Sequence, residues 1–265
     1  MKRVFLLRAY GDFIVAIQSL IHSNALSKFQ IIASSHLLPL FEALPASIIP
    51  ANLSIQFVDF GIKKSMLNVF TNRYLFQLDT FKQLNHLSAF LNQYPSEKNY
   101  DFIDNNYHKW LLELGTAHQF GAIGSSENIY LSFHAFFESQ VPMIQLPQKQ
   151  NYNILILPSA RIAKRNLPDQ LVKKIKQKHA SLNDKVIIAN YRSTTSDSKM
   201  YSNFIELVQL IEEADFVYGA DSLPIHLSNI LQKPHFILYP KSVTSQFFTP
   251  YALANNSHAN FKSFT

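Results

Sequence analysis

Short, mostly apolar runs, of which residues 4–7 are wholly apolar, alternate with helical patterns along this sequence, and the alternation stops once and then restarts. An apolar run without polar interruptions predicts a strand that is buried on both faces, as in a parallel sheet. The expected strands lie at residues 4–7, 30–33, 54–58, 100–104, 120–123, 153–157, 185–189, 216–218 and 235–239. The clearest helical patterns lie at residues 13–26, 168–179, 203–212 and 222–231. Strands that alternate with helices predict doubly wound α/β sheets.

The alternation is interrupted at residues 140–150, a polar segment that contains prolines and is typical of a domain boundary. We therefore expect two Rossmann-like doubly wound parallel-sheet domains that face each other across a cleft. Their predicted bounds are 1–145 and 151–265, with a tail that could pack back on the first domain. Ligands of such sheets bind at the carboxyl ends of the strands. Function is therefore expected in the loops at 8–12, 158–165, 190–196 and 219–222.

The formal net charge of +6 favours an anionic partner, and the cations gather at residues 161–178. The lysines at 173–178 are interpreted as a solvated helix face. Arg161, Lys164 and Arg165 lie in a turn before that helix and are better ligand candidates. The chain has no cysteine, which excludes a disulfide framework, a thiol nucleophile and a cysteine-bound metal. No nucleic-acid-binding motif is present, and no apolar run is long enough to span a bilayer, so we expect a soluble protein without a nucleic-acid partner.

The segment at residues 221–227, Asp-Ser-Leu-Pro-Ile-His-Leu, follows an expected strand and begins an expected helix. Asp221 or Ser222 is a natural N-cap for that helix. Its apolar face is expected to pack on the sheet, which leaves Ser222, His226 and Asn229 toward the cleft. An exposed helix N-terminus presents N–H groups and a positive dipole end, which favour phosphate. The alternative is a capped structural helix with an incidental histidine.

The segment at residues 8–12, Arg-Ala-Tyr-Gly-Asp, follows the first expected strand. Gly11 allows a sharp turn of the backbone, and Asp12 is then expected at a helix N-terminus. A carboxylate there could accept a proton from an acceptor hydroxyl. Because the helix dipole lowers its pKa, Asp12 would need burial or a partner to be a good base. The alternative role of Asp12 is that of an ordinary N-cap.

The segment at residues 158–168 places Ser159, a small residue, at the end of a strand and follows it with Arg161, Lys164 and Arg165. These cations could neutralise the charge that develops on a departing pyrophosphate. Arginine would bind it through two N–H groups, and lysine would act as a point charge. The alternative is a basic surface loop.

Together the three segments resemble the bacterial lipopolysaccharide heptosyltransferases, glycosyltransferase family 9, which have the two-domain GT-B fold. The family begins with a strand, an arginine and a Gly-Asp pair, for which this chain has Arg8, Gly11 and Asp12. The family's most specific stretch is Asp-Ser/Thr-Gly-x-x-His-Leu followed by Lys-Pro, which corresponds here to residues 221–227 and 233–234. The resemblance covers nearly the whole chain, but only this last segment is specific.

The resemblance implies an enzyme that moves a sugar, for example a heptose, from a nucleotide-diphosphate donor to a lipopolysaccharide or other surface-glycan acceptor. It implies a direct, inverting displacement that uses no metal and no cofactor. The first domain would be the acceptor side and the second the donor-binding side. Such an enzyme would be cytoplasmic, and an acceptor anchored in the inner membrane would favour peripheral contact with that membrane.

By the same resemblance, Asp12 would be the general base, and the donor diphosphate would lie against the turn at 221–226. The residues implied for that site are Arg8, Gly11, Ser159, Arg161, Lys164, Arg165, Asp221, Ser222, Leu223 and His226. Leu223 stands where the family has a glycine, and Arg165 stands where it has a lysine, so either Lys164 or Arg165 could be the phosphate cation. A degenerate, non-catalytic member that binds a nucleotide or glycan precursor is the alternative, and a nucleotide-sugar epimerase of the same fold is a third hypothesis.

Overall fold

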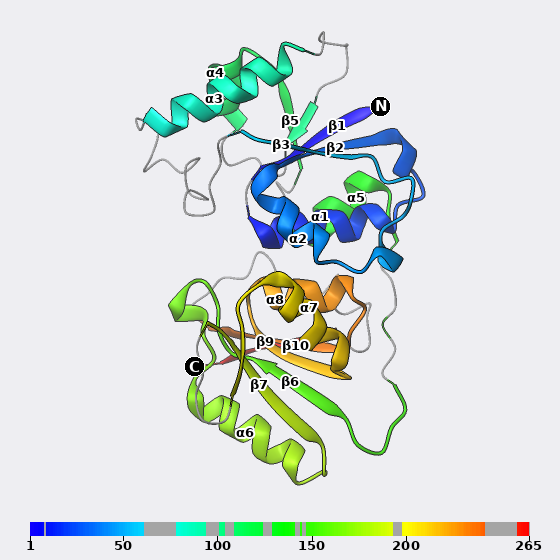
Figure 1. Ribbon diagram of the computed structural model, residues 1–265, viewed down its shortest axis with the longest axis vertical. Coiled ribbons are helices and arrows are strands. Elements are labelled where there is room, and N and C mark those ends of the chain that lie inside the picture. Colours follow the sequence, from blue (N-terminus) through cyan, green and yellow to red (C-terminus); the bar gives the residue numbers. More distant parts are fainter. Residues whose placement is uncertain are drawn as a thin grey trace. The chain divides into compact units, whose positions relative to one another are not determined.

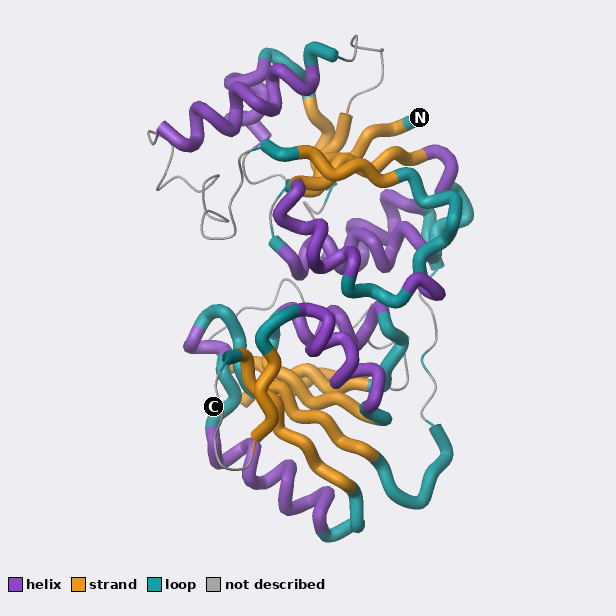
Figure 2. The backbone as a smooth tube through the Cα atoms, in the orientation of Figure 1, coloured by secondary structure: helices purple, strands orange, loops and turns teal. Residues whose placement is uncertain are grey.

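The chain divides into two compact units, Met1–Gln140 and Val141–Thr265. The computed structural model describes residues 1–7, 9–60, 78–93, 101–103, 109–123, 129–140, 144, 147–192, 198–241 and 259–264. Each unit contains one sheet whose strands run parallel to one another, with helices on both of its faces (Figure 1; Figure 2). The predicted α/β class with two doubly wound parallel sheets is therefore confirmed.

The first unit has a five-stranded sheet in the order β3-β2-β1-β4-β5. Its strands are β1 (Lys2–Leu6), β2 (Phe29–Ser34), β3 (Ile55–Val58), β4 (Asp101–Ile103) and β5 (Phe120–Ala122). Helices α1 (Tyr10–Ile21), α2 (Leu38–Glu42) and α5 (Ile129–Phe137) cover one face, and α3 (Leu78–Leu91) and α4 (Lys109–Thr116) cover the other (Figure 1). Short 3₁₀ turns lie at Leu26–Lys28, Ser35–Leu37 and Ala46–Ile48.

The core of the first unit is aromatic on the face beneath α3 and α4. Phe5 is fully buried in the central strand and meets Phe90 and Phe120 edge-on, at centroid distances of 6.2 and 5.8 Å. The strand order changes direction at β1, so the turn between β1 and α1 lies at a topological switch point. In open α/β sheets this is where ligands bind.

The second unit has a six-stranded sheet in the order β11-β10-β9-β6-β7-β8. Its strands are β6 (Asn153–Leu157), β7 (Lys185–Tyr191), β8 (Ser198–Tyr201), β9 (Phe216–Ala220), β10 (His235–Pro240) and β11 (Ala259–Phe264). Helix α6 (Asp169–Ala180) covers one face, and α7 (Phe204–Glu213) and α8 (Leu223–Ile230) cover the other (Figure 1). The switch point of this sheet lies between β6 and β9, which are neighbours.

All nine expected strands are present, but β8 and β11 were not expected. The first helix begins at Tyr10, three residues earlier than the pattern predicts, and ends at Ile21. Residues 259–264 of the predicted tail form β11 and pair with β10 along its whole length. Their backbone hydrogen bonds are made inside the second sheet, where an edge strand gains a full ladder.

Candidate functional site

Ser159 and Asp221 come together because their strands are paired. Leu157 of β6 pairs with Gly219 of β9. Ser159 and Asp221 each follow two residues after that pair, so they lie side by side at the carboxyl edge of the sheet. Ser159 Oγ donates a hydrogen bond to Asn190 Oδ1 at 2.9 Å, and Ser222 Oγ donates one to the carbonyl oxygen of Ser159 at 3.4 Å. The loops after β6 and β9 and the carboxyl end of β7 are thus joined by polar contacts at the switch point.

Helix α8 begins in this cluster. Ser222 is its N-cap and is extended (φ −164°, ψ 176°), but its side chain makes no capping hydrogen bond. Its hydroxyl turns instead to the carbonyl oxygens of Ser159 and Ala220. The first N–H groups of α8 are therefore not capped by Ser222, which leaves the partial positive charge of the helix N-terminus available to an anion.

Leu223, which stands where the family that the sequence resembles has a glycine, is the first residue of α8. It is not among the described residues with a positive φ, so this position requires no glycine for its backbone conformation. Gly219 in β9 has a clearer steric role. A Cβ atom there would lie 3.0 Å from Ile225 Cδ1, so the glycine allows α8 to pack closely on the sheet.

Arg165 is the cation that the structure brings to the site. It ends the 3₁₀ turn Ala163–Arg165, and its Nη1 lies 3.2 Å from Asp221 Oδ2. The Arg165 side chain is 24% exposed and the Asp221 side chain 3%. Arg161 and Lys164 are exposed instead. Of the two candidates for the phosphate cation, Arg165 is the one held beside the N-terminus of α8.

The electrostatics of the site follow from burial. Burial raises the pKa of Asp221 to about 6, and the positive charge of Arg165 opposes that rise. Burial lowers the pKa of His226 to about 3, with smaller contributions from His235 and Arg165. Burial also lowers the pKa of His235 to about 4. Both imidazoles are therefore neutral at physiological pH, and Asp221 titrates near it.

The expectation that His226 and Asn229 lie on an open polar face is wrong. They are 8% and 5% exposed, and every residue from Pro224 to Ile230 is buried. The physical reason is that α8 packs against β9, β10 and α7 together, which leaves no side of this short helix open. Ser222 and Leu223, at its first turn, keep partial exposure.

In the first unit, Asp12 lies in the first turn of α1, as predicted, and is half-buried. Gly11 does not form the expected turn before the helix, because α1 already begins at Tyr10 and Gly11 is helical. Arg8 lies outside the described residues. The side chain of Tyr10 reaches the end of β2, where its hydroxyl donates to the carbonyl oxygen of His36 at 3.3 Å.

Sequence reasoning missed three residues at these edges. Asn190 holds Ser159, His36 contacts Tyr10 with ring centroids 5.7 Å apart, and Ser34 Oγ lies 2.9 Å from His36 Nδ1. The position of Asn190 and Ser34 at the ends of expected strands was the available signal. No motif singles them out, since a strand-end Asn or Ser is common in turns.

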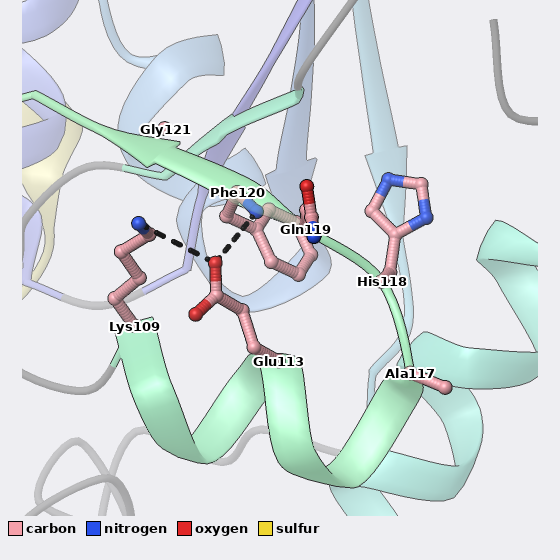
Figure 3. A pocket seen from close by; sticks show the side chains of 7 residues that line it. All are labelled: Lys109, Glu113, Ala117, His118, Gln119, Phe120 and Gly121. Atoms are coloured by element: carbon pink, nitrogen blue, oxygen red, sulfur yellow. Dashed lines mark hydrogen bonds and ion pairs between the residues drawn. The ribbon is translucent and has the colours of Figure 1, made fainter. Parts of the chain in front are cut away.

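A separate pocket lies in the first unit, at the amino end of β5, and it contains none of the predicted site residues (Figure 3). Its lining residues are Lys109, Glu113, Ala117, His118, Gln119, Phe120 and Gly121. Glu113 accepts the backbone N–H of Phe120 at 3.0 Å and pairs with Lys109 at 3.4 Å (Figure 3). Because ligands of such sheets bind at the carboxyl ends of the strands, we place the candidate site elsewhere.

Within the described part of the chain, no group of three or more His, Cys, Asp or Glu side chains is arranged to hold a metal ion. Among the helices of the described ranges, none combines the length and the apolar character needed to cross a bilayer.

Solved structures share this fold at low sequence identity. A glycosyl transferase family 9 protein from Veillonella parvula superposes with a TM-score of 0.61 and 13% identity, over 99% of this chain and 86% of that one. The E. coli heptosyltransferase WaaC with ADP gives 0.56 and 12%, over 99% and 93%. The UDP-GlcNAc 2-epimerase of Methanocaldococcus jannaschii, in complex with UDP-GlcNAc and UDP, gives 0.51 and 11%, over 100% and 89%.

No protein-family model matches the sequence, and no curated protein is similar to it in sequence. On the evidence of the solved structures, the chain has the fold of the family 9 heptosyltransferases. An epimerase has the same fold, so the fold by itself does not decide the reaction.

Proposed function

We propose that this protein is a glycosyltransferase that moves a sugar from a nucleotide-diphosphate donor to a glycan or glycolipid acceptor. The observation that carries the proposal is the convergence of Arg165, Asp221 and Ser159 at the N-terminus of α8, which the Ser222 side chain does not cap, at the switch point of the second sheet. A cation beside a helix N-terminus is suited to a diphosphate. The solved heptosyltransferases of this fold, one of them with ADP, support the same class of ligand.

In this proposal the second unit binds the donor diphosphate. Arg165 and the first N–H groups of α8 stabilise the negative charge, and Ser159 and Ser222 shape the loop around it. Leu223 replaces the family's glycine with a side chain that the backbone accommodates without strain. Asp221 and His226 are buried beneath the turn that begins α8. In this proposal they support the conformation of that turn, and Asp221 adds a negative charge beside Arg165.

The proposed reaction is a direct displacement with inversion. The acceptor hydroxyl oxygen forms a bond to the anomeric carbon while the bond from that carbon to the donor's phosphate oxygen breaks. The hydroxyl proton passes to the Asp12 carboxylate. The nucleoside diphosphate leaves with the bonding electron pair, and Arg165 stabilises the added charge. The reaction as proposed uses no metal or cofactor.

Lipopolysaccharide or another surface glycan is the proposed acceptor and heptose the proposed sugar, and both rest on the resemblance to family 9. A cytoplasmic enzyme in peripheral contact with the inner membrane follows from that acceptor. An epimerase would instead convert the donor sugar without any acceptor, and a degenerate binding protein would bind the donor without converting it.

The test is donor binding and transfer with a matched pair of variants. Thermal shifts with ADP, GDP, UDP and CDP identify the base, because a ligand that binds only the folded state raises its apparent stability. Asp12→Asn should then abolish sugar transfer but keep donor binding, whereas Asp59→Asn, at an exposed aspartate of the same unit, should keep both. Full transfer by Asp12→Asn would refute the role of Asp12. Conversion of the donor sugar without acceptor would favour the epimerase.

A further inference from the structure

The contact between Arg165 and Asp221 is an ion pair with poor hydrogen-bond geometry. The charged atoms lie 3.2 Å apart, but Asp221 Oδ2 is buried and accepts no hydrogen bond from the described residues. Arg165 Nε is likewise buried and donates none to them. A buried carboxylate oxygen that is paired in charge but not hydrogen-bonded is costly. The two side chains therefore attract each other through their charges, and no hydrogen bond joins Arg165 Nε or Asp221 Oδ2 to the other group.

The imidazole of His226, which interacts electrostatically with Arg165, is uncharged at neutral pH. His226 of α8 and His235 of β10 are both buried, and burial lowers their pKa values to about 3 and about 4. Lys164 of the 3₁₀ turn is exposed. Among the described residues, Asp221 pairs with Arg165 and changes its charge near neutral pH, since burial raises its pKa to about 6.

An anion that approaches Arg165 meets this carboxylate. Arg165 keeps 24% of its side chain exposed, while Asp221 is 3% exposed and lies behind it. The Asp221 carboxylate and the anion are both negative and repel each other beside the same guanidinium, and this repulsion is stronger in a partly buried site than in water. The system lowers this energy by adding a proton to the buried carboxylate, because a neutral carboxyl is the form that burial already favours.

We propose that Asp221 is the resident counter-ion of Arg165, and that a phosphate-bearing anion binds at Arg165 together with one proton taken up by the Asp221 carboxylate. This inference rests on the proposed donor site and adds a regulatory property to it. The affinity for the anion rises as the pH falls from 8 toward 5.5, and Asp221 is a positioning residue that acts through Arg165.

The test measures inorganic pyrophosphate binding calorimetrically at pH 8 and pH 5.5, with the wild type and Asp221→Asn. If bound pyrophosphate raises the pKa of Asp221 by one unit, Asp221→Asn binds about tenfold tighter than the wild type at pH 8 and less than about twofold tighter at pH 5.5. Pyrophosphate also titrates, but equally with both proteins. Asp169→Asn removes the same charge from an exposed position of the same unit and should match the wild type at both pH values.

A second readout is the number of protons taken up, measured at pH 7 in buffers of different ionisation enthalpy. The wild type should take up more protons per pyrophosphate than Asp221→Asn, and thermal unfolding checks that the variant is folded. Binding to Asp221→Asn alone at pH 8 would also support the proposal. Equal affinity and equal proton uptake in the two proteins would overturn it and leave the anion site in place.

The failure of this inference can be told apart from that of the proposed function. If neither protein binds pyrophosphate at any pH, the anion site itself is refuted, and the inference with it. If the proton linkage is observed but no sugar is transferred, the proposed enzyme activity fails and the role of Asp221 stands.

Discussion

Two buried histidines of the second unit, His226 and His235, predict a steep loss of stability in mild acid. His235 is fully buried, its Nδ1 donates to the carbonyl oxygen of Lys233 at 2.8 Å, and its Nε2 is buried without a hydrogen bond to the described residues. His226 is 8% exposed. Burial lowers their pKa values from 6.5 to about 4 and about 3. As the pH falls below 6.5, these two histidines become protonated in the unfolded chain but stay neutral in the folded chain, so the free energy of unfolding decreases.

The magnitude can be worked out between pH 7 and pH 5. Each histidine with a folded pKa well below 5 costs about 2 kcal/mol over this interval, or about 4 kcal/mol for the pair. Asp221 acts in the opposite direction, because its raised pKa of about 6 lets the folded state take up a proton first. Its contribution is about 1 kcal/mol, which leaves a net loss of about 3 kcal/mol. For a unit of this size that corresponds to a Tm lower by roughly 10 °C.

The assay follows thermal and urea unfolding at pH 7, 6 and 5 for the wild type and His235→Asn. Asparagine retains an N–H donor near the position of Nδ1 but does not titrate, so the variant should lose about 2 kcal/mol of the pH dependence. Its absolute stability can differ because asparagine is smaller, and for that reason the slope with pH is the readout. The reasoning is refuted if the two proteins show the same slope, or if the wild type is equally stable at pH 7 and pH 5.

Three further predictions concern contacts in each unit. Asp101→Ala should destabilise the first unit by about 3 kcal/mol, because Asp101 is a buried carboxylate that pairs with Arg3 and His118 at 2.9 Å each. Lys28→Gln, at an exposed ion pair, should cost less than about 0.5 kcal/mol, and chemical unfolding of both variants measures the difference. Arg165→Gln should weaken pyrophosphate binding about tenfold or more and Lys164→Gln less than about threefold, and equal losses by titration calorimetry would contradict our choice of cation. Lys233→Met should lower stability by about 1–2 kcal/mol, since its Nζ donates to the carbonyl oxygens at the end of α7, and an unchanged Tm would show that these bonds are dispensable.

The parts of the fold that the sequence predicted are those with strong, local patterns. The inner strands of both sheets are mostly apolar because both of their faces are covered, and that pattern is visible without any structure. Strands β8 and β11 have polar sequences, Ser-Lys-Met-Tyr and Ala-Asn-Phe-Lys-Ser-Phe, because they lie at the two edges of the second sheet. An edge strand has less surface to bury, so polar residues are tolerated there and the apolar signal is lost.

The site was predicted in its position but not in its details. The ends of β6 and β9 were expected to meet, and they do, because parallel strands bring their carboxyl ends to one edge. The choice between Lys164 and Arg165 could not be made from the sequence, since neighbouring side chains in a 3₁₀ turn point about 120° apart and only the packing decides which one faces Asp221. The burial of His226 was missed because helical spacing shows two faces but not whether a third element covers one of them.

The most direct test of the central claim is sugar transfer by the purified protein. Nucleotide-diphosphate sugars, including ADP-heptose, are incubated with a lipopolysaccharide acceptor that lacks its outer sugars, and the released nucleoside diphosphate and the glycosylated product are quantified together. Our account predicts that one donor yields both in equal amounts, with inversion at the anomeric carbon, and that Asp12→Asn and Arg165→Gln reduce the yield. It is contradicted if well-folded wild-type protein forms no glycosylated product with any of these donors.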